Sequence, residues 1–235
     1  MKKGLLIAID GPVASGKGTI AKLLAKKISA IHFNTGAMYR ALALKCMSQN
    51  INLRDEKSVI QTLKTSSIEL RILENNVPRV FLDGNDVEDK ILNPKVAMGA
   101  SEVGLISEVA QILVGLQRDI AKQASEDGHS VVMEGRQIGK DVIPDADLKL
   151  FITADFETRA KRRLKQYLQK GISKDLDSVL KETKLRDFQD LTRKTGALPK
   201  DPKAFGYVIL DNSNLSEEQT LSVIIEILKE KGFYE

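Results

Sequence analysis

A glycine-rich stretch near the start of the chain, GPVASGKGTI at residues 11–20, has residue types that can bind phosphate. Gly11, Gly16 and Lys17 satisfy the pattern G-x-x-x-x-G-K-[ST], in which backbone N–H groups surround a phosphate and the lysine reaches the outer phosphates of a nucleotide. The expected hydroxyl arrives one position late, because Gly18 follows the lysine and Thr19 comes next. A simple glycine turn is the alternative, but it leaves Lys17 unexplained. The predicted nucleotide-binding residues are Gly11, Pro12, Val13, Ala14, Ser15, Gly16, Lys17, Gly18 and Thr19.

A second candidate set lies in RDFQDLTR, residues 186–193. Arg186, Asp190 and Arg193 are spaced four and three residues apart, so on a helix they share one face. A carboxylate between two arginines can hold their planar forks in the geometry that binds phosphate bidentately. A solvated, salt-bridged helix surface is the alternative.

A third set lies in ETRAKRR, residues 157–163. Arg159 precedes Arg162 and Arg163 by three and four residues, which again places them on one helix face. In a chain that also carries a phosphate loop, this pattern favours arginines that converge on phosphates over a solvated charged face.

The charge distribution indicates which class of molecule the protein binds. Residues 155–200 contain 13 Lys and Arg against 7 Asp and Glu, while the whole chain has a net charge of +4. Such a basic segment suits nucleic acid or a nucleotide phosphate chain. Only Phe156, Tyr167 and Phe188 are aromatic within it, which offers little surface on which bases could stack. We therefore expect a small nucleotide and no nucleic acid partner.

No histidine belongs to any of these motifs. His32 and His129 are the only two in the chain, and we interpret both as structural or surface residues. A phosphate acceptor needs no general base near neutral pH, because its second pKa is about 6 and its oxygen is already ionised. Phosphoryl transfer then depends on positioning and on charge stabilisation.

Composition indicates an ordinary globular chain of 235 residues, with 42% hydrophobic and 29% charged residues. No apolar run approaches the ~20 residues that span a bilayer. The N-terminal apolar stretch ends at Asp10, which makes it too short for a signal peptide. Because Cys46 is the single cysteine, no internal disulfide is possible. We expect a cytoplasmic protein with no membrane contact.

The elements that must position these residues alternate between strands and helices. Residues 5–9 form a continuous apolar run, which is typical of a strand buried on both faces of a parallel sheet. Further strands are predicted at about 29–34, 130–133, 148–152 and 207–210, and helices at about 20–28, 37–48, 94–124 and from 216 onwards. This order predicts an α/β fold with a doubly wound parallel sheet of about five strands flanked by helices.

Two segments interrupt that order. From residue 67 apolar and polar residues alternate, which predicts a small antiparallel hairpin or meander. We therefore divide one domain into a core (about 1–62, 101–155 and 200–235), a small α+β insert (about 63–100) and a charged, helical segment (about 156–199).

Taken together, these motifs resemble the bacterial cytidylate kinase family, within the nucleoside monophosphate kinases. The resemblance runs through IDGPVASGKGT, NTGAMYRALAL, MEGRQIG, ETRAKRRLKQYLQKG, LRDFQDLTR and VILDNSNLS. It implies a P-loop NTPase-type fold, with 63–100 as the acceptor-binding insert and 156–199 as a short mobile lid. It also implies transfer of phosphate from ATP to CMP or dCMP with Mg²⁺, in a protein that we expect to be a monomer.

The resemblance assigns roles to individual residues. Lys17, Arg159, Arg163 and Arg186 would be catalytic, stabilising the transferring phosphoryl group as the lid closes. Mg²⁺ would be held mainly by phosphates and water, with Thr19 as a possible ligand. Glu134 could organise the magnesium waters or be a structural carboxylate. The acceptor-binding residues would be Thr35, Arg40, Ser101, Arg136, Gln137, Arg186, Asp190 and Arg193.

Two positions depart from the family pattern. Gln137 replaces the acidic residue of the usual Gly-Arg-Asp, and Ala110 occupies the place of a usual arginine. Both changes fall on base recognition, where unpaired polar groups discriminate strongly between substrates. Three alternatives to the cytidylate kinase activity therefore stay open at this point: a kinase for another acceptor such as UMP, a nucleic-acid-binding ATPase and a non-catalytic nucleotide sensor.

Overall fold

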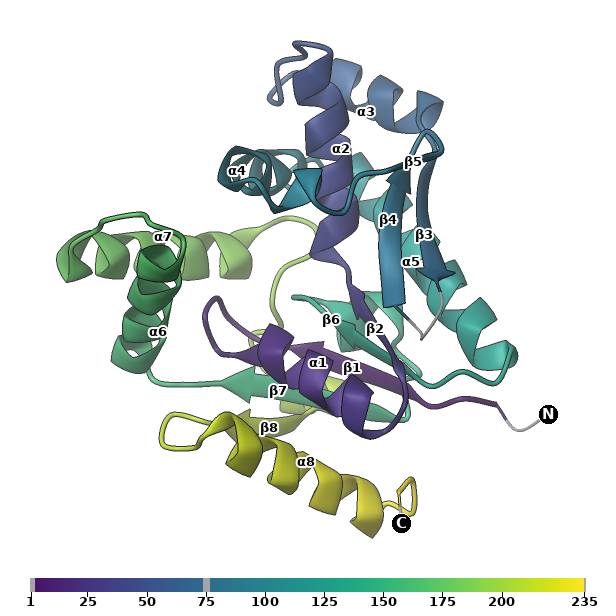
Figure 1. Ribbon diagram of the computed structural model, residues 1–235, viewed down its shortest axis with the longest axis vertical. Helices are drawn as coiled ribbons and strands as arrows, with labels where there is room; N and C mark the ends of the chain where they lie inside the picture. The colour runs from purple at the N-terminus through teal and green to yellow at the C-terminus, as the bar shows by residue number, and fades with distance from the viewer. Residues whose placement is uncertain (1–2, 74–76, 235) are drawn as a thin grey trace.

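Five parallel strands form the central sheet of the computed structural model, which describes residues 3–73 and 77–234 (Figure 1). The strands are β1 (Leu6–Asp10), β2 (Ile31–Asn34), β6 (Val131–Glu134), β7 (Leu148–Thr153) and β8 (Val208–Asp211). Their order across the sheet is β2-β6-β1-β7-β8, and every neighbouring pair is parallel. The predicted α/β sheet is confirmed, and each predicted strand is present with ends shifted by a few residues.

The central strand β1 is buried on both faces, as its continuous apolar run predicts. Ile7 and Ile9 pack into the apolar cluster under α1 (Lys17–Lys27) and α8 (Glu217–Glu230). Leu6 and Ala8 face the opposite cluster, under α5 (Ser107–Glu126). Helices therefore cover both sides of the strand that leads into the phosphate loop.

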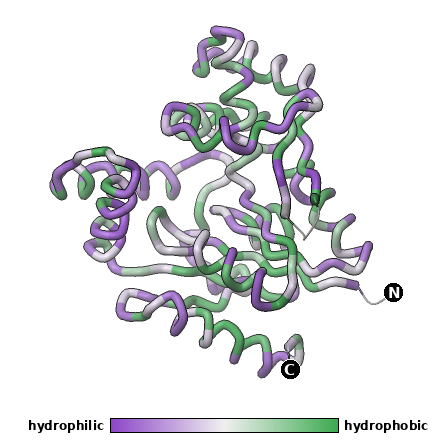
Figure 2. The backbone as a smooth tube through the Cα atoms, in the orientation of Figure 1, coloured by the Kyte–Doolittle hydropathy of each residue, from purple (hydrophilic) through white to green (hydrophobic). Residues whose placement is uncertain are grey.

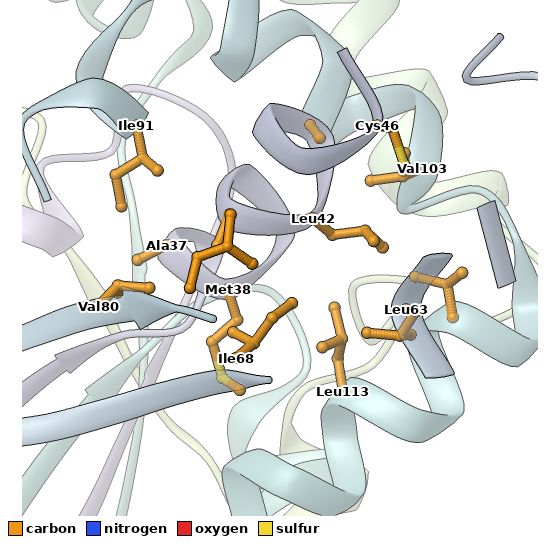
Figure 3. Close-up of a cluster of buried hydrophobic side chains, with 14 of the residues drawn as sticks. Ala37, Met38, Leu42, Cys46, Leu63, Ile68, Val80, Ile91, Val103 and Leu113 are labelled. Atoms are coloured by element: carbon orange, nitrogen blue, oxygen red, sulfur yellow. The ribbon is translucent and has the colours of Figure 1, made fainter. Parts of the chain in front are cut away.

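A second apolar core lies beside the sheet, around α2 (Gly36–Ser48). Figure 3 shows Ala37, Met38, Leu42 and Cys46 of this helix surrounded by side chains from the neighbouring elements. These elements are α3 (Glu56–Thr65), β3 (Ile68–Leu73), β4 (Val77–Leu82), the 3₁₀ turn η2 (Lys90–Leu92), α4 (Pro94–Val103) and α5. The two-residue strand β5 (Asn85–Asp86) pairs with β4 and is exposed. α2 and α3 thus pack into the same core as residues 68–103.

Two local features of this region differ from the sequence prediction. The single helical stretch predicted at 94–124 is two helices, α4 and α5, which meet at a bend of 106°. Helix α3, which Asp55 caps through the Ser58 backbone N–H, was not predicted. The predicted hairpin is confirmed as the antiparallel pair β3 and β4, although residues 74–76 of its turn lie outside the described residues.

The charged segment forms an arm of two packed helices, α6 (Phe156–Gln169) and α7 (Leu176–Thr192), beside the carboxyl ends of the strands (Figure 1). Figure 2 shows hydrophilic stretches along this arm. Asp155 and Asp175 cap the two helices by accepting hydrogen bonds from Thr158 and Ser178. As predicted, the segment contains no strand among its described residues.

Two short turns complete the structure: η3 (Ile138–Val142), a π-helical turn after β6, and η4 (Lys203–Phe205), a 3₁₀ turn before β8. Among the described residues no single helix has the length and apolar character of a membrane span. Among the same residues, only α4 and α5 taken as one segment are long and apolar enough, and a bend separates the two helices.

Candidate active site

The glycine loop joins β1 to α1 and ends where Lys17 begins the helix. Gly16 has a φ of +86°, a left-handed conformation that a residue with a Cβ adopts only under strain. Ala14 also has a positive φ, of +57°. Left-handed residues of this kind let successive backbone N–H groups point into one concavity, which is the arrangement that binds phosphate. The predicted strand–loop–helix order is confirmed.

Lys17 lies deep in the site with a relative exposure of 7%. Its Nζ donates to the Pro12 carbonyl at 3.2 Å, and it forms no salt bridge with any described residue. Burial lowers the pKa of Lys17 to about 7, and the charge of Arg136 adds to this effect. A phosphate placed beside Lys17 would therefore stabilise the cation that burial disfavours.

Two arginines of α6 hold the phosphate loop from outside. Arg159 Nη1 donates to the Val13 carbonyl at 3.2 Å, and Arg162 Nη1 donates to the Ser15 carbonyl at 3.3 Å. Asn212 Nδ2 donates to the same Ser15 carbonyl at 3.0 Å. Because C=O and N–H point in opposite directions in a trans peptide, the N–H groups of the next residues are turned away from these side chains. The arginines therefore fix the orientation of the loop peptides.

The three arginines of ETRAKRR share the side of α6 that faces the site, but they differ in their contacts. Arg159 is 7% exposed and forms a bidentate pair with Asp187 of α7, at 2.9 and 2.6 Å. It does not line the main cavity, whereas Arg163 does. Arg163 also donates to the Tyr167 hydroxyl at 3.2 Å. Of the predicted pair, only Arg163 is therefore placed to reach a ligand directly.

One cavity of about 460 Å³ contains both sets of predicted ligand-binding residues. On the donor side it is lined by Val13, Ala14, Gly16, Lys17, Gly18 and Thr19. On the acceptor side it is lined by Thr35, Arg40, Ser101, Arg136, Gln137, Arg186 and Arg193. Gly11, Pro12 and Ser15 support the loop without lining the cavity. The fold thus brings together residues that lie far apart in the sequence.

Asp190 organises the acceptor arginines although it is itself fully buried and does not line the cavity. Its carboxylate accepts from Arg136 Nε at 2.6 Å and from Arg193 Nη2 at 2.7 Å, and Arg186 Nε lies 3.3 Å away. Burial raises its pKa, but the three arginine charges outweigh this and hold the pKa below its usual value. The prediction that Asp190 positions Arg186 and Arg193 agrees with this geometry, and Arg136 joins them.

Arg186 also connects the arm to α4. Its Nη1 donates to the Ser101 hydroxyl of α4 at 2.5 Å. Burial lowers the pKa of Arg186 to about 10, and the charge of Asp190 opposes that effect. These contacts hold Arg186 at the edge of the cavity with its charge retained near neutral pH.

The inner end of the cavity carries the remaining predicted residues. Thr35 donates from its hydroxyl to the Glu134 carbonyl at 3.0 Å. Arg40 is partly buried, and its Nε has no hydrogen-bond partner among the described residues. The Glu134 side chain is 8% exposed and lies close to Gly18 of the phosphate loop. Polar groups without protein partners at this end are available to a ligand.

Comparisons with known proteins identify the family of this chain. A family model described as "Cytidylate kinase" matches residues 7–230. The chain belongs to the cytidylate kinase family. The cytidylate kinase of Caldicellulosiruptor saccharolyticus is 44% identical over 97% of this chain and 96% of its own length. That of Lactobacillus johnsonii is 36% identical over 98% of each chain. A crystal structure of an uncharacterized protein from Eubacterium ventriosum shares the fold, with a TM-score of 0.54 at 18% identity over 97% of this chain and 99% of that one.

The two departures from the cytidylate kinase pattern both line the cavity. Ala110 is 1% exposed and Gln137 is 7% exposed. The Gln137 Oε1 atom is buried without a hydrogen-bond partner in the described residues. A Cβ on Gly196 would lie only 2.8 Å from it, and Gly196 has a φ of +78°. The glycine therefore leaves the space that the longer glutamine side chain occupies.

Several residues of this cytidylate kinase site were not identified from the sequence. Asp187 pairs with Arg159, Asn212 holds the phosphate loop, and Gln117 donates to the Thr35 carbonyl at 3.5 Å. Asp10 is fully buried at the carboxyl end of β1. Asp10 was identifiable from the sequence, because it is an acidic residue at the end of a buried strand, directly before a glycine loop. The other three belong to no spacing pattern, because their partners are 28 to 197 residues away.

Proposed function

We propose that this member of the cytidylate kinase family transfers the terminal phosphoryl group of ATP to CMP or dCMP and so forms CDP or dCDP. The observation that carries the proposal is the shared cavity, in which Lys17 and the phosphate loop lie opposite the cationic acceptor set. Two negatively charged nucleotides in one cavity of that size would meet with their phosphates between these groups. Placing both reactants together supplies much of the rate enhancement in such reactions.

On the donor side, the loop residues fit a nucleotide triphosphate. The left-handed Gly16 and Ala14 form the concavity, and the Ser15 hydroxyl is buried without a hydrogen-bond partner among the described residues. Lys17 would stabilise the charge that develops on the transferring group. Mg²⁺ bound to the phosphates would neutralise further charge. The exposed Thr19 hydroxyl and the Glu134 carboxylate offer oxygen ligands, directly or through water, of the kind that this cation prefers.

On the acceptor side, Arg136, Arg186 and Arg193 would bind the acceptor nucleotide while Asp190 keeps their forks in place. Arg40 and Ser101 would add contacts at the same end, and Thr35 and Gln137 would contact the base. The acceptor phosphate is ionised near neutral pH, so its oxygen attacks without a general base. Arg163 would stabilise the transferring group directly, and Arg159 would do so through the loop that it holds.

We also propose which segments of the chain bind the acceptor, close over the site and form the core. Residues 63–100 would serve as the acceptor-binding insert and residues 156–199 as the lid, with the remaining segments as the core. Lid closure would exclude water and so favour transfer to the nucleotide over hydrolysis. We further propose that the protein works as a cytoplasmic monomer.

A panel of acceptors tests this function. We expect CMP and dCMP to give kcat/KM values at least about ten-fold above those of UMP and AMP, with ATP and Mg²⁺ present. Comparable values for UMP or AMP would contradict the cytidine assignment, and ATP binding without turnover of any monophosphate would contradict the enzymatic one. The panel is repeated with Gln137→Asp, whose carboxylate accepts from the cytosine amine and repels a carbonyl. Sharper selectivity for cytosine in this variant would support the placement of residue 137 at the base.

A further inference from the structure

Asp10 lies between the phosphate loop and the acceptor side of the cavity. It is the last residue of β1, directly before Gly11 of the phosphate loop, and its side chain is fully buried. One carboxylate oxygen accepts from the Ile138 backbone N–H at 2.9 Å, and the other accepts from the Gly139 N–H at 2.9 Å. These two amides begin the turn η3, immediately after the acceptor residues Arg136 and Gln137.

A third hydrogen bond joins the end of the arm to the same carboxylate. The Tyr207 hydroxyl donates to Asp10 at 2.5 Å, and Tyr207 lies directly before β8, where the chain returns from residues 156–206. The ring is 5% exposed and packs edge to face on Phe151 of β7. Gly139 has no side chain to obstruct this approach, because a Cβ there would lie 2.9 Å from the tyrosine oxygen.

All three neighbours of Asp10 are donors, which matches a carboxylate that only accepts. Burial raises the pKa of Asp10, while the bonds from Ile138, Tyr207 and Gly139 and the charge of Lys17 act in the opposite direction. Burial also raises the pKa of Tyr207, so its hydroxyl keeps the proton that it donates. A buried anion with this many donors holds them firmly, since a lost donor leaves charge uncompensated.

We propose that Asp10 is a positioning residue that fixes the acceptor residues Arg136 and Gln137 relative to the phosphate loop. The inference rests on the proposed phosphoryl transfer. Asp10 does not line the cavity and acts through the backbone of Ile138 and Gly139. In-line transfer needs the acceptor oxygen close to the phosphoryl group, and a displacement of about 1 Å lowers rates by about 100-fold. The phosphate loop has its own supports in Arg159, Arg162 and Asn212, so loss of the Asp10 bonds displaces the acceptor side.

The kinetic test compares three variants with the wild-type enzyme. Asp10→Asn replaces one accepting oxygen with an amide N–H₂ group, which then faces hydrogen-bond donors. We therefore expect kcat/KM for CMP to fall by about 10- to 100-fold. The KM for ATP should stay within about two-fold. Tyr207→Phe removes one bond and keeps the ring, and should produce a smaller loss in the same direction. Ser125→Ala is the matched control, because it removes a single partly buried hydrogen bond, 2.6 Å to the Gly4 carbonyl, near the opposite end of β1.

Unchanged kinetic constants for CMP in Asp10→Asn, with only a lower thermal midpoint like that of Ser125→Ala, would overturn the proposal. An equal rise in the KM values for ATP and CMP would do the same. If Asp10→Asn does not fold, Tyr207→Phe decides, and wild-type constants for CMP in that variant overturn it. Amide hydrogen exchange at Ile138 and Gly139 gives a readout independent of the acceptor. Exchange at these two amides should be faster in Asp10→Asn than in Ser125→Ala. This expectation holds even if the wild type phosphorylates no monophosphate. Equal exchange rates in the two variants would contradict the positioning role.

Discussion

Arg136 and Asp190 lie 54 residues apart, yet Arg136 Nε donates to Asp190 Oδ2 at 2.6 Å. Arg136 follows strand β6 of the core, while Asp190 lies near the end of α7 in the arm. The Asp190 side chain is wholly buried in this pair. The contact ties the arm directly to the acceptor side of the cavity.

Asp190→Asn should weaken both stability and acceptor use. The amide cannot balance Arg136, Arg186 and Arg193, and removing one partner of a buried ion pair costs about 3–5 kcal/mol. We expect kcat/KM for CMP to fall by about 100-fold, because the arginine forks lose their orientation. Denaturant unfolding and steady-state kinetics measure the two effects. Asp83→Asn, which breaks the surface pair with Lys45, is the control and should change stability by less than about 1 kcal/mol. Similar losses in both variants would contradict the assignment.

Arg159 and Arg163 should respond differently to the same substitution. Arg159→Met leaves the partly buried Asp187 unpaired and should lower stability by about 3 kcal/mol. Arg163→Met should leave stability nearly unchanged and lower kcat by about 100-fold, because this guanidinium lines the cavity. Lys161→Met, on the exposed side of the same helix, should alter neither quantity. A stability loss in Arg163→Met equal to that in Arg159→Met would show that the two arginines do not have these separate roles.

Gly196→Ala should disturb the base end of the cavity. The new Cβ would lie 2.8 Å from Gln137 Oε1, so the glutamine must move. We expect the KM for CMP to rise by about ten-fold while the KM for ATP is unchanged. Gly84→Ala provides the control, because Gly84 has a φ of +79° but no atom within 4 Å of its Cβ position. In both variants the left-handed backbone conformation costs about 1 kcal/mol once the residue has a Cβ. Only Gly196→Ala also places that Cβ against the Gln137 side chain. Equal KM values in the two variants would contradict the role of Gln137.

The titration of Lys17 should make both stability and ATP binding depend on pH. Burial lowers the pKa of Lys17 in the folded protein to about 7 from its ordinary value of 10.5. Between these values the unfolded chain binds the extra proton, so stability should rise with pH across this window. ATP favours the charged lysine, so its affinity should fall as pH rises above about 7.

Calorimetry in two buffers of different ionisation enthalpy measures the proton balance of ATP binding. We expect proton uptake at pH 8, and we expect Lys17→Met to abolish both that uptake and the rise in stability. Proton release by the wild type, or an unchanged pH dependence in Lys17→Met, would show that another group is responsible.

The fold and the donor loop could be predicted because their signals are local. A strand such as β1 shows as an unbroken apolar run when both faces are covered, and the glycine loop follows it without a gap. The bend between α4 and α5 was missed because apolar spacing continues through it, and α3 because it is short. The acceptor residues came from the family resemblance and not from spacing alone.

From the amino-acid sequence alone it follows that a phosphate loop comes after a buried strand and that arginines recur on two helix faces. Which arginine supports the loop and which faces the cavity follows from the packing of distant segments. Asp187 takes Arg159 into a buried pair because α7 packs on α6, and Asp190 draws Arg136 towards the arm. The partner of a charged side chain depends on packing between segments far apart in the chain, while the loop conformation depends on neighbouring residues. Helical spacing therefore identified the arginines, and packing assigned their roles.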